Sequence, residues 1–186
     1  MGKNVDQLPA VTAWENDDLL YLRKASDPIA TADKGISAGN LFNSRRTYGQ
    51  LFMDINTTPG AITTSTTPAV VTVFDNASPL QGITDTLVTG RLTVDAGQPT
   101  GLYAASFACS FATTTNTNYM VAMFINGAIT GLAAATDQVN NAVNAGNAAA
   151  SGLVSLSAGD FIDLRIWSDA AGSATFASAI LNLTRI

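Results

Sequence analysis

The chain has 186 residues, no histidine, one cysteine and a formal net charge of −5. Without histidine it lacks the most common general base and metal ligand, and one cysteine makes neither an internal disulfide nor a zinc cluster. The acidic balance argues against a nucleic-acid surface, which needs clustered Lys and Arg to neutralise phosphates.

Charge divides the chain into two parts. Residues 1–48 hold six basic and six acidic side chains, whereas residues 49–186 hold three arginines and eight aspartates, with no Lys and no Glu. We therefore predict an N-terminal segment at 1–47 and a body at 48–186. Free monomers usually carry about a quarter charged residues. The Thr-, Ser-, Asn-, Ala- and Gly-rich body is instead typical of assembly proteins whose faces neighbours cover, or of secreted β-proteins.

The sequence pattern of the N-terminal segment predicts two short strands. One is the apolar run at 19–22, which follows an acidic turn, and the other begins at Lys34. The turn at 26–28 contains a proline, which fixes φ and lacks a donor. No apolar leader follows Met1 and no run approaches the ~20 apolar residues that span a bilayer. We expect a chain made in a cytoplasm that needs no membrane.

The body predicts about eight strands separated by turns. The longest clean alternation of apolar and small residues is at 101–112, and Asn126-Gly127 is a strong signal for a type I′ hairpin turn. Residues 128–150 leave helix, loop and short strand open. The pattern predicts an all-β, antiparallel sandwich or jelly roll. The predicted strands are 48–53, 69–74, 88–94, 101–112, 119–125, 151–156, 161–167 and 175–186.

Several motifs of the body occur together in one known fold. They are Tyr48-Gly49, Gly90-Arg91-Leu92-Thr93 before Gly101-Leu102-Tyr103, Asn126-Gly127, the Leu-x-x-Gly-Asp run at 156–160, and the apolar terminal strand around 179–183. In this order they resemble the C1q/TNF-like jelly roll found in many phage particle proteins. The first 48 residues resemble the short N-terminal module of phage tail-fibre and decoration proteins, on the strength of Leu8-Pro9, Asp17-Asp18, the apolar run at 19–22 and the segment 35–42.

The resemblance implies a homotrimer that attaches to a particle through its N-terminal segment. The residues expected to dock on the particle are Leu8, Pro9, Leu19, Leu20, Leu22, Leu41 and Phe42. Those expected near the three-fold axis are Tyr103, Phe107, Ile180 and Leu183, for which the alternative is the sandwich core. The expected partners are the chain itself and the major capsid protein or another virion protein, and the expected location is the virion.

We expect no catalytic site, cofactor or metal ion. Asp160 and Asp163 are the closest carboxylate pair in the body, but Asp160 fits a turn and Asp163 shares a strand face with Arg165. The calcium candidates, Asp75-Asn76 and Asp95, are better explained as turn residues. Trp14 and Trp167 could stack on sugars, although packing roles are the simpler interpretation.

Three functions remain in order of support. The first is a capsid decoration or cement trimer. The second is a receptor- or glycan-binding fibre or spike tip, with a host surface glycan as ligand. The third, an enzyme acting on polysaccharide, has the weakest support. Neither nucleic acid nor membrane is an expected partner.

Overall fold

The computed structural model describes residues 19–21, 35–37, 47–54, 60–114, 117–136 and 146–186. The chain divides into two compact units, Met1–Arg45 and Arg46–Ile186. In the first unit, β1 (Leu19–Tyr21) pairs antiparallel with β2 (Gly35–Ser37), as the two predicted short strands require. Leu19 and Leu20 thus lie on β1. The other docking candidates, Leu8, Pro9, Leu22, Leu41 and Phe42, and also Trp14, lie outside the described residues.

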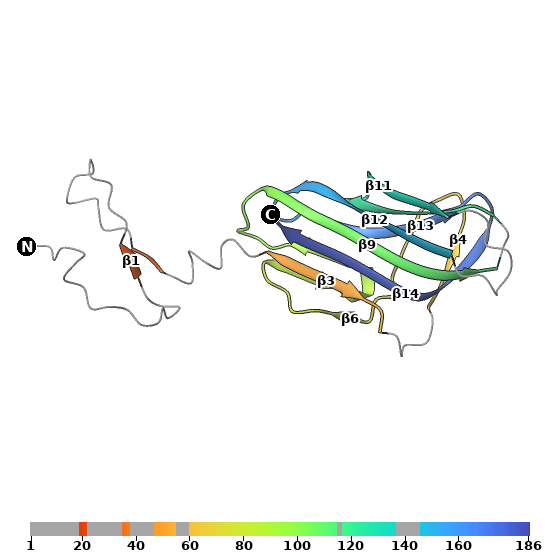
Figure 1. Ribbon diagram of the computed structural model, residues 1–186, viewed down its shortest axis with the longest axis horizontal. Coiled ribbons are helices and arrows are strands. Elements are labelled where there is room, and N and C mark those ends of the chain that lie inside the picture. Colours follow the sequence, from red (N-terminus) through yellow and green to blue (C-terminus); the bar gives the residue numbers. More distant parts are fainter. Residues whose placement is uncertain (1–18, 22–34, 38–46, 55–59, 115–116, 137–145) are drawn as a thin grey trace, which may run out of the picture. The chain divides into compact units, whose positions relative to one another are not determined.

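The second unit is a sandwich of two antiparallel sheets, as the sequence predicts. The strands of the first sheet run in the order β12-β9-β14-β3-β6, and β4 pairs with β14 (Figure 1). Its long central strands, β9 and β14, cross the whole face of the sandwich. The six strands are β3 (Tyr48–Phe52), β4 (Gly60–Thr64), β6 (Asn76–Ala77), β9 (Gly101–Thr113), β12 (Gly146–Leu156) and β14 (Gly172–Arg185).

The second sheet lies behind the first in the view of Figure 1 and has the order β11-β10-β13-β8-β7, with β5 paired to β13. One turn of 3₁₀ helix, η3 (Leu87–Thr89), precedes β8 and ends at Gly90, whose φ is +62°. The six strands are β5 (Ala69–Val70), β7 (Ile83–Thr86), β8 (Arg91–Val94), β10 (Tyr119–Ile125), β11 (Ala128–Thr136) and β13 (Phe161–Ser168).

The core lies between the two sheets and is filled by alternate residues of their strands. Phe111 of β9 is its aromatic centre, with its ring centroid 5.9 Å from that of Tyr119 and 5.4 Å from that of Phe176. Leu51, Leu92 and Leu164 are also fully buried. Within the described ranges, no helix is long and apolar enough to cross a membrane.

The alanine-rich stretch that sequence left open forms two strands wherever it is described. Residues 128–136 pair with β10 and residues 146–156 pair with residues 101–111 of β9, so the helical option is wrong there. The side chain of Leu132 on β11 packs over Gly152 on β12, where a Cβ would approach Leu132 Cδ2 to 2.5 Å. Small residues therefore let the two sheets close on each other at this edge, and this packing outweighs the helix propensity of alanine.

Local turn chemistry is confirmed at the β10–β11 hairpin. Asn126 has φ +50° and Gly127 has φ +83°, the two positive values that a type I′ turn needs. Other boundaries differ from prediction. The run predicted at 69–74 is a strand only in β5, and η3 occupies the start of the one predicted at 88–94. The segment 75–85, which lies between two predicted strands, holds β6 and part of β7.

Candidate interaction surfaces

The outward side of β12, β9, β14 and β3 carries uncharged side chains, many of them small, and we call it the small-residue face. These four strands contain only one charged residue, Arg185 near the end of β14. Three rows of cross-strand neighbours follow from the register. They are Leu153–Ala104–Thr184–Tyr48, Ser151–Ser106–Asn182–Gln50 and Ala149–Ala108–Ile180–Phe52.

The polar side chains on this face bond to one another. Gln50 Nε2 donates to Asn182 Oδ1 at 2.6 Å, and Asn182 Nδ2 donates to Ser106 Oγ at 3.2 Å. One row further along, Ser178 Oγ donates to Ser110 Oγ at 3.1 Å. Because several of their hydrogen bonds are already made, these polar groups lose less when water is removed from the face.

A shallow groove of about 720 Å³ runs along the small-residue face. Phe52, Ala108, Ala149 and Ile180 are among its lining residues. Cys109 lies beneath it with 5% of its surface exposed, and burial raises the pKa of its thiol to about 12. A buried thiol with a raised pKa is chemically inert.

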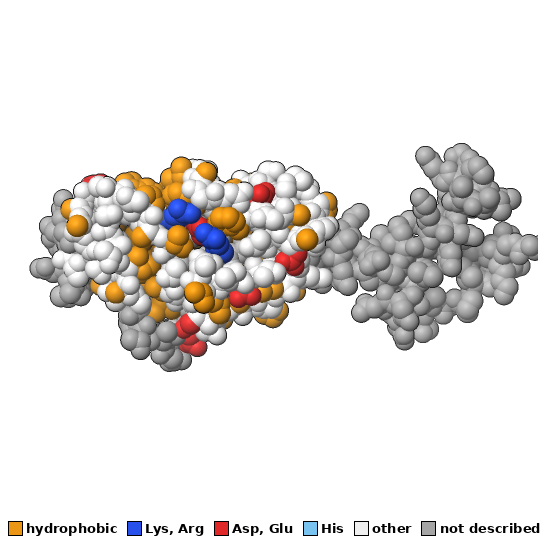
Figure 2. All heavy atoms as spheres, turned by 180° about the vertical axis from the view of Figure 1, so that it is seen from behind, with side chains coloured by type: hydrophobic (Ala, Val, Ile, Leu, Met, Phe, Trp, Pro, Cys, Tyr) orange, Lys and Arg blue, Asp and Glu red, His pale blue; other side chains and the backbone are white. Residues whose placement is uncertain are grey.

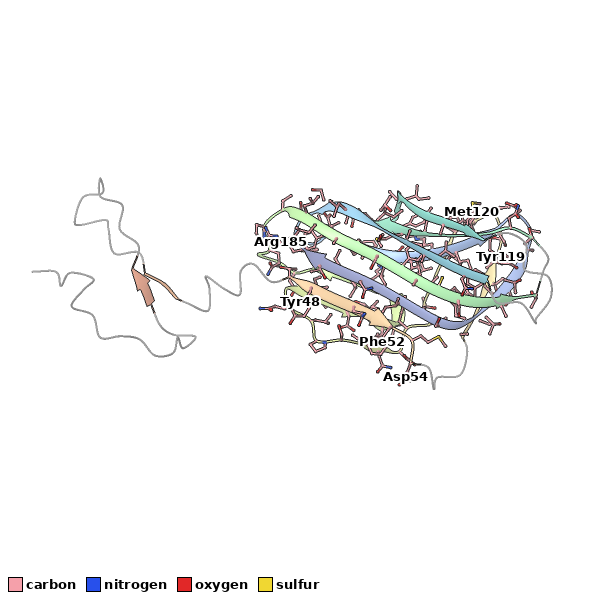
Figure 3. The ribbon with its side chains drawn as sticks, viewed as in Figure 1. Tyr48, Phe52, Asp54, Tyr119, Met120 and Arg185 are labelled. Carbon is pink, nitrogen blue, oxygen red and sulfur yellow. The ribbon has the colours of Figure 1, made fainter. Side chains whose placement is uncertain are left out.

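Large apolar side chains are exposed toward one end of the small-residue face. Leu102 is 47% exposed, Leu153 is 59% exposed and Tyr48 is 38% exposed. Figure 3 shows Tyr48 near Arg185 at this end of the sandwich, with Tyr119 and Met120 at the opposite end. The groove and the exposed apolar residues together mark a surface that suits contact with another protein.

The structure places most of the expected three-fold residues inside the sandwich. Tyr103, Phe107 and Leu183 are at most 2% exposed within a single chain, so their side chains have almost no surface to offer a neighbour. They belong to the sandwich core, which the sequence analysis gave as the alternative location. Ile180 is half-buried and faces outward, where it lines the groove.

The opposite outer face carries a compact group of charges and rings, which we call the arginine–aromatic cluster: Arg91, Asp163, Arg165, Phe124 and Phe161. Arg165 binds the buried carboxylate of Asp163 with two hydrogen bonds, from Nε at 2.8 Å and from Nη2 at 3.1 Å. This confirms the pairing expected from the sequence. Arg91 Nε lies 3.6 Å from Asp163 Oδ2. Figure 2 shows the positive side chains gathered over a negative one, with hydrophobic atoms beside them.

Both guanidinium groups of the cluster lie on aromatic rings. The centre of the Arg91 guanidinium is 4.2 Å from the ring centroid of Phe161, and that of Arg165 is 4.5 Å from the centroid of Phe124. Trp167 meets Phe124 edge-on at 6.4 Å. Sequence alternation indicated the β13 members, but Arg91 comes from β8 and joins them only through the β8–β13 register.

The other candidate carboxylates take part in local structure. Asp160 accepts hydrogen bonds from Asn126 Nδ2 at 2.7 Å and from the Ser157 backbone N–H at 2.7 Å, and these bonds lower its pKa. Asp75 Oδ1 accepts from the backbone N–H of Asp54, and Asp95 Oδ1 accepts from Thr84 Oγ1. In the described ranges, no three acidic or cysteine side chains come together as metal ligands would.

Comparison with solved structures shows the fold. The tumour necrosis factor Eiger from S. frugiperda matches with a TM-score of 0.56 and 18% identity, over 76% of this chain and 93% of that chain. The protein has the C1q/TNF-like jelly-roll fold. The globular domain of zebrafish complement 1qA matches with a TM-score of 0.47 and 11% identity, over 74% of this chain and 94% of that one. Murine APRIL matches with a TM-score of 0.47 and 14% identity, over 76% of this chain and 99% of that one.

Two comparisons of the sequence gave no match. No family model matches it, and no curated protein matches it. Since the structural match to Eiger is at low identity, it establishes the jelly roll, and function has to be argued from the surfaces of this chain.

Proposed function

We propose that this chain is a non-enzymatic structural protein of a bacteriophage particle, whose jelly rolls associate as a homotrimer. The observation that carries the proposal is the small-residue face. A free protein normally keeps its surface in water with interspersed charges. The outward residues of these four strands carry none. Such a face suits burial against a neighbour.

The occupant that best fits this face is a second copy of the chain. A charged partner would find no complementary charge there, whereas another uncharged face of small side chains can approach closely without burying an unpaired charge. The exposed side chains of Leu102 and Leu153 add apolar area that contact would remove from water. Three copies, rather than two, follow the resemblance of the body to jelly rolls that pack around a three-fold axis.

Attachment to the particle is assigned to residues 1–47. This segment has a balanced set of charges, unlike the body, and the resemblance to phage N-terminal modules supports a docking role for it. Its partner would be the major capsid protein or another virion protein, so the chain would be found in the virion. A decoration or cement role fits the short distance in sequence between this segment and the jelly roll.

The first test is the mass of the purified chain in solution, paired with pelleting against undecorated capsids. We expect three times the 19.2 kDa mass of one chain, and a trimer that pellets with the capsids. Changing Leu19→Ala together with Phe42→Ala should release the trimer from capsids and leave its mass unchanged. A monomer would overturn the trimer, and a trimer that ignores capsids would favour the fibre-tip alternative.

A further inference from the structure

Arg91 has hydrogen-bond donors that the chain itself does not use. Its Nε is buried and makes no hydrogen bond, because the nearest carboxylate oxygen is 3.6 Å away. No hydrogen bond joins its guanidinium to any of the described residues. A buried donor without an acceptor is rare in folded proteins. Because Nε lies beside Asp163, the donors left for an acceptor from outside are those on the rest of the guanidinium, in a side chain that is 37% exposed.

The balance of charge at the cluster points to an anion. Two guanidinium groups face one carboxylate, which leaves one positive charge in a body that has eight aspartates and three arginines. The side chain of Asp163 is 0% exposed, whereas that of Arg91 is 37% exposed and that of Arg165 is 18% exposed. A group arriving from water therefore meets the cations before the carboxylate that lies beneath them.

The guanidinium groups are held in place before any ligand arrives. Arg91 lies on Phe161, and Arg165 is fixed both by Phe124 and by its two bonds to Asp163. Stacking on a ring orients the flat fork of donors, which matches the two oxygens of a carboxylate. Less conformational entropy is then lost on binding.

An aromatic side chain stands beside these cations on the same strand face. Trp167 is two residues from Arg165 and is partly exposed. One positive charge next to a flat ring suits one carboxylate attached to a sugar ring, which can pack on the indole. An acidic peptide suits the site less well, because the only other basic residue of the body is Arg185, at the end of a strand in the other sheet.

We propose that the arginine–aromatic cluster binds a carboxylated sugar, such as a uronic or sialic acid unit of a surface polysaccharide. Arg91 supplies the free donors for the carboxylate, Arg165 adds positive charge and holds Asp163, and Trp167 packs against the sugar ring. The site lies on the outer face opposite the small-residue face. It therefore does not depend on whether the chain forms a trimer or decorates a capsid.

The test is titration of the full chain with small probes, followed by NMR or calorimetry. The probes are the methyl glycosides of glucuronic acid and N-acetylneuraminic acid, with methyl glucoside, acetate and a glutamate-rich peptide for comparison. We expect at least one sugar acid to bind at least about tenfold more tightly than both methyl glucoside and acetate. Equal binding of acetate would reduce the cluster to a simple anion site, and tighter binding of the peptide would assign it to a protein partner. Either result, or no binding at all, overturns the proposal.

Variants locate the binding site. Arg91→Gln should weaken the sugar acid about tenfold or more and keep the fold, because Arg165 still pairs with Asp163. Arg91→Lys keeps the positive charge but lacks the planar pair of guanidinium donors, so it should also weaken binding. Because this variant conserves the charge beside Asp163, weaker binding by it cannot be ascribed to a fold lost with that charge. Arg185→Gln removes the same charge elsewhere and should change nothing. If Arg91→Gln binds as the parent does, or Arg185→Gln weakens binding equally, the assignment is wrong.

Discussion

The two outer faces of the sandwich differ in how their polar and charged side chains are arranged. The small-residue face has no charge on its outward side, and its polar side chains bond along rows that cross the strands. The opposite face concentrates two of the three arginines of the body around one buried aspartate. An even, uncharged surface suits a copy of the same chain, whereas a local group of fixed charges suits a small ligand of matching charge.

A single positive charge on the small-residue face should have the largest effect. Ala108 lies in the middle of that face and lines the groove. Ala108→Arg would bury an unpaired charge in each contact between copies, at a cost of several kcal/mol, so we expect the mass in solution to fall from three chains to one.

The matched control for that variant is Val88→Arg, which adds the same charge at a residue that is 86% exposed on η3. The Val88→Arg chain should keep the mass of a trimer in light scattering or sedimentation. If both variants remain trimers, the small-residue face is not the contact, and the difference between the two faces loses its functional meaning.

Removal of the buried carboxylate tests the opposite face. Asp163→Asn leaves Arg91 and Arg165 close together without a compensating charge. We expect the free energy of unfolding to fall by about 3 kcal/mol, toward the low end for breaking a buried pair, because both arginines keep some contact with water. Urea denaturation measures the change.

An exposed aspartate provides the comparison for Asp163. Asp169 accepts a hydrogen bond from Asn118 at 2.8 Å, at the surface. Asp169→Asn should therefore alter the free energy of unfolding by no more than about 0.5 kcal/mol. Similar losses in the two variants would mean that the cluster contributes no more to stability than an ordinary surface contact.

The sequence predicted the scaffold well because local patterns decide it. The alternation in β9 correctly grouped Tyr103, Phe107 and Phe111 on one side, and the Asn126-Gly127 turn followed from backbone preference alone. Alternation does not say which side faces the core when the other side, with Ala104 and Ala108, is small and uncharged as well. For this reason the sequence alone does not separate core residues of β9 from residues at a contact between copies.

What the sequence could not give depends on the pairing of distant strands. Arg91 and Asp163 are opposite each other only because β8 pairs with β13 in one register. The short strands β4 and β7 have weak local signals and are held by the strands with which they pair, β14 and β8. The alanine-rich β11 and β12 are likewise strands because of the neighbours with which they pair.

The smallest expected effect concerns a turn that belongs to neither face. Hydrogen bonds from Asn126 and from the Ser157 backbone lower the pKa of Asp160 in the folded state. In the unfolded chain an aspartate has a pKa of about 3.9. The stability that these bonds add is therefore present above about pH 4 and is lost as pH falls through the lower, folded-state pKa.

Asp160→Asn should remove this dependence on pH, since its side chain no longer titrates. At pH 7 the parent should be more stable by no more than about 1 kcal/mol, because the turn is open to water. The difference should shrink toward pH 3.

Urea denaturation at pH 7 and pH 3 measures this difference in stability. Both chains carry Ala108→Arg as well, so that assembly does not contribute. Asn126→Ala should lower the stability at pH 7 by more than Asp160→Asn does. It also removes the hydrogen bond that Asn126 Oδ1 accepts from the Phe161 N–H, and it places alanine at φ +50°. A difference that stays constant with pH would show that the carboxylate charge plays no part in this turn.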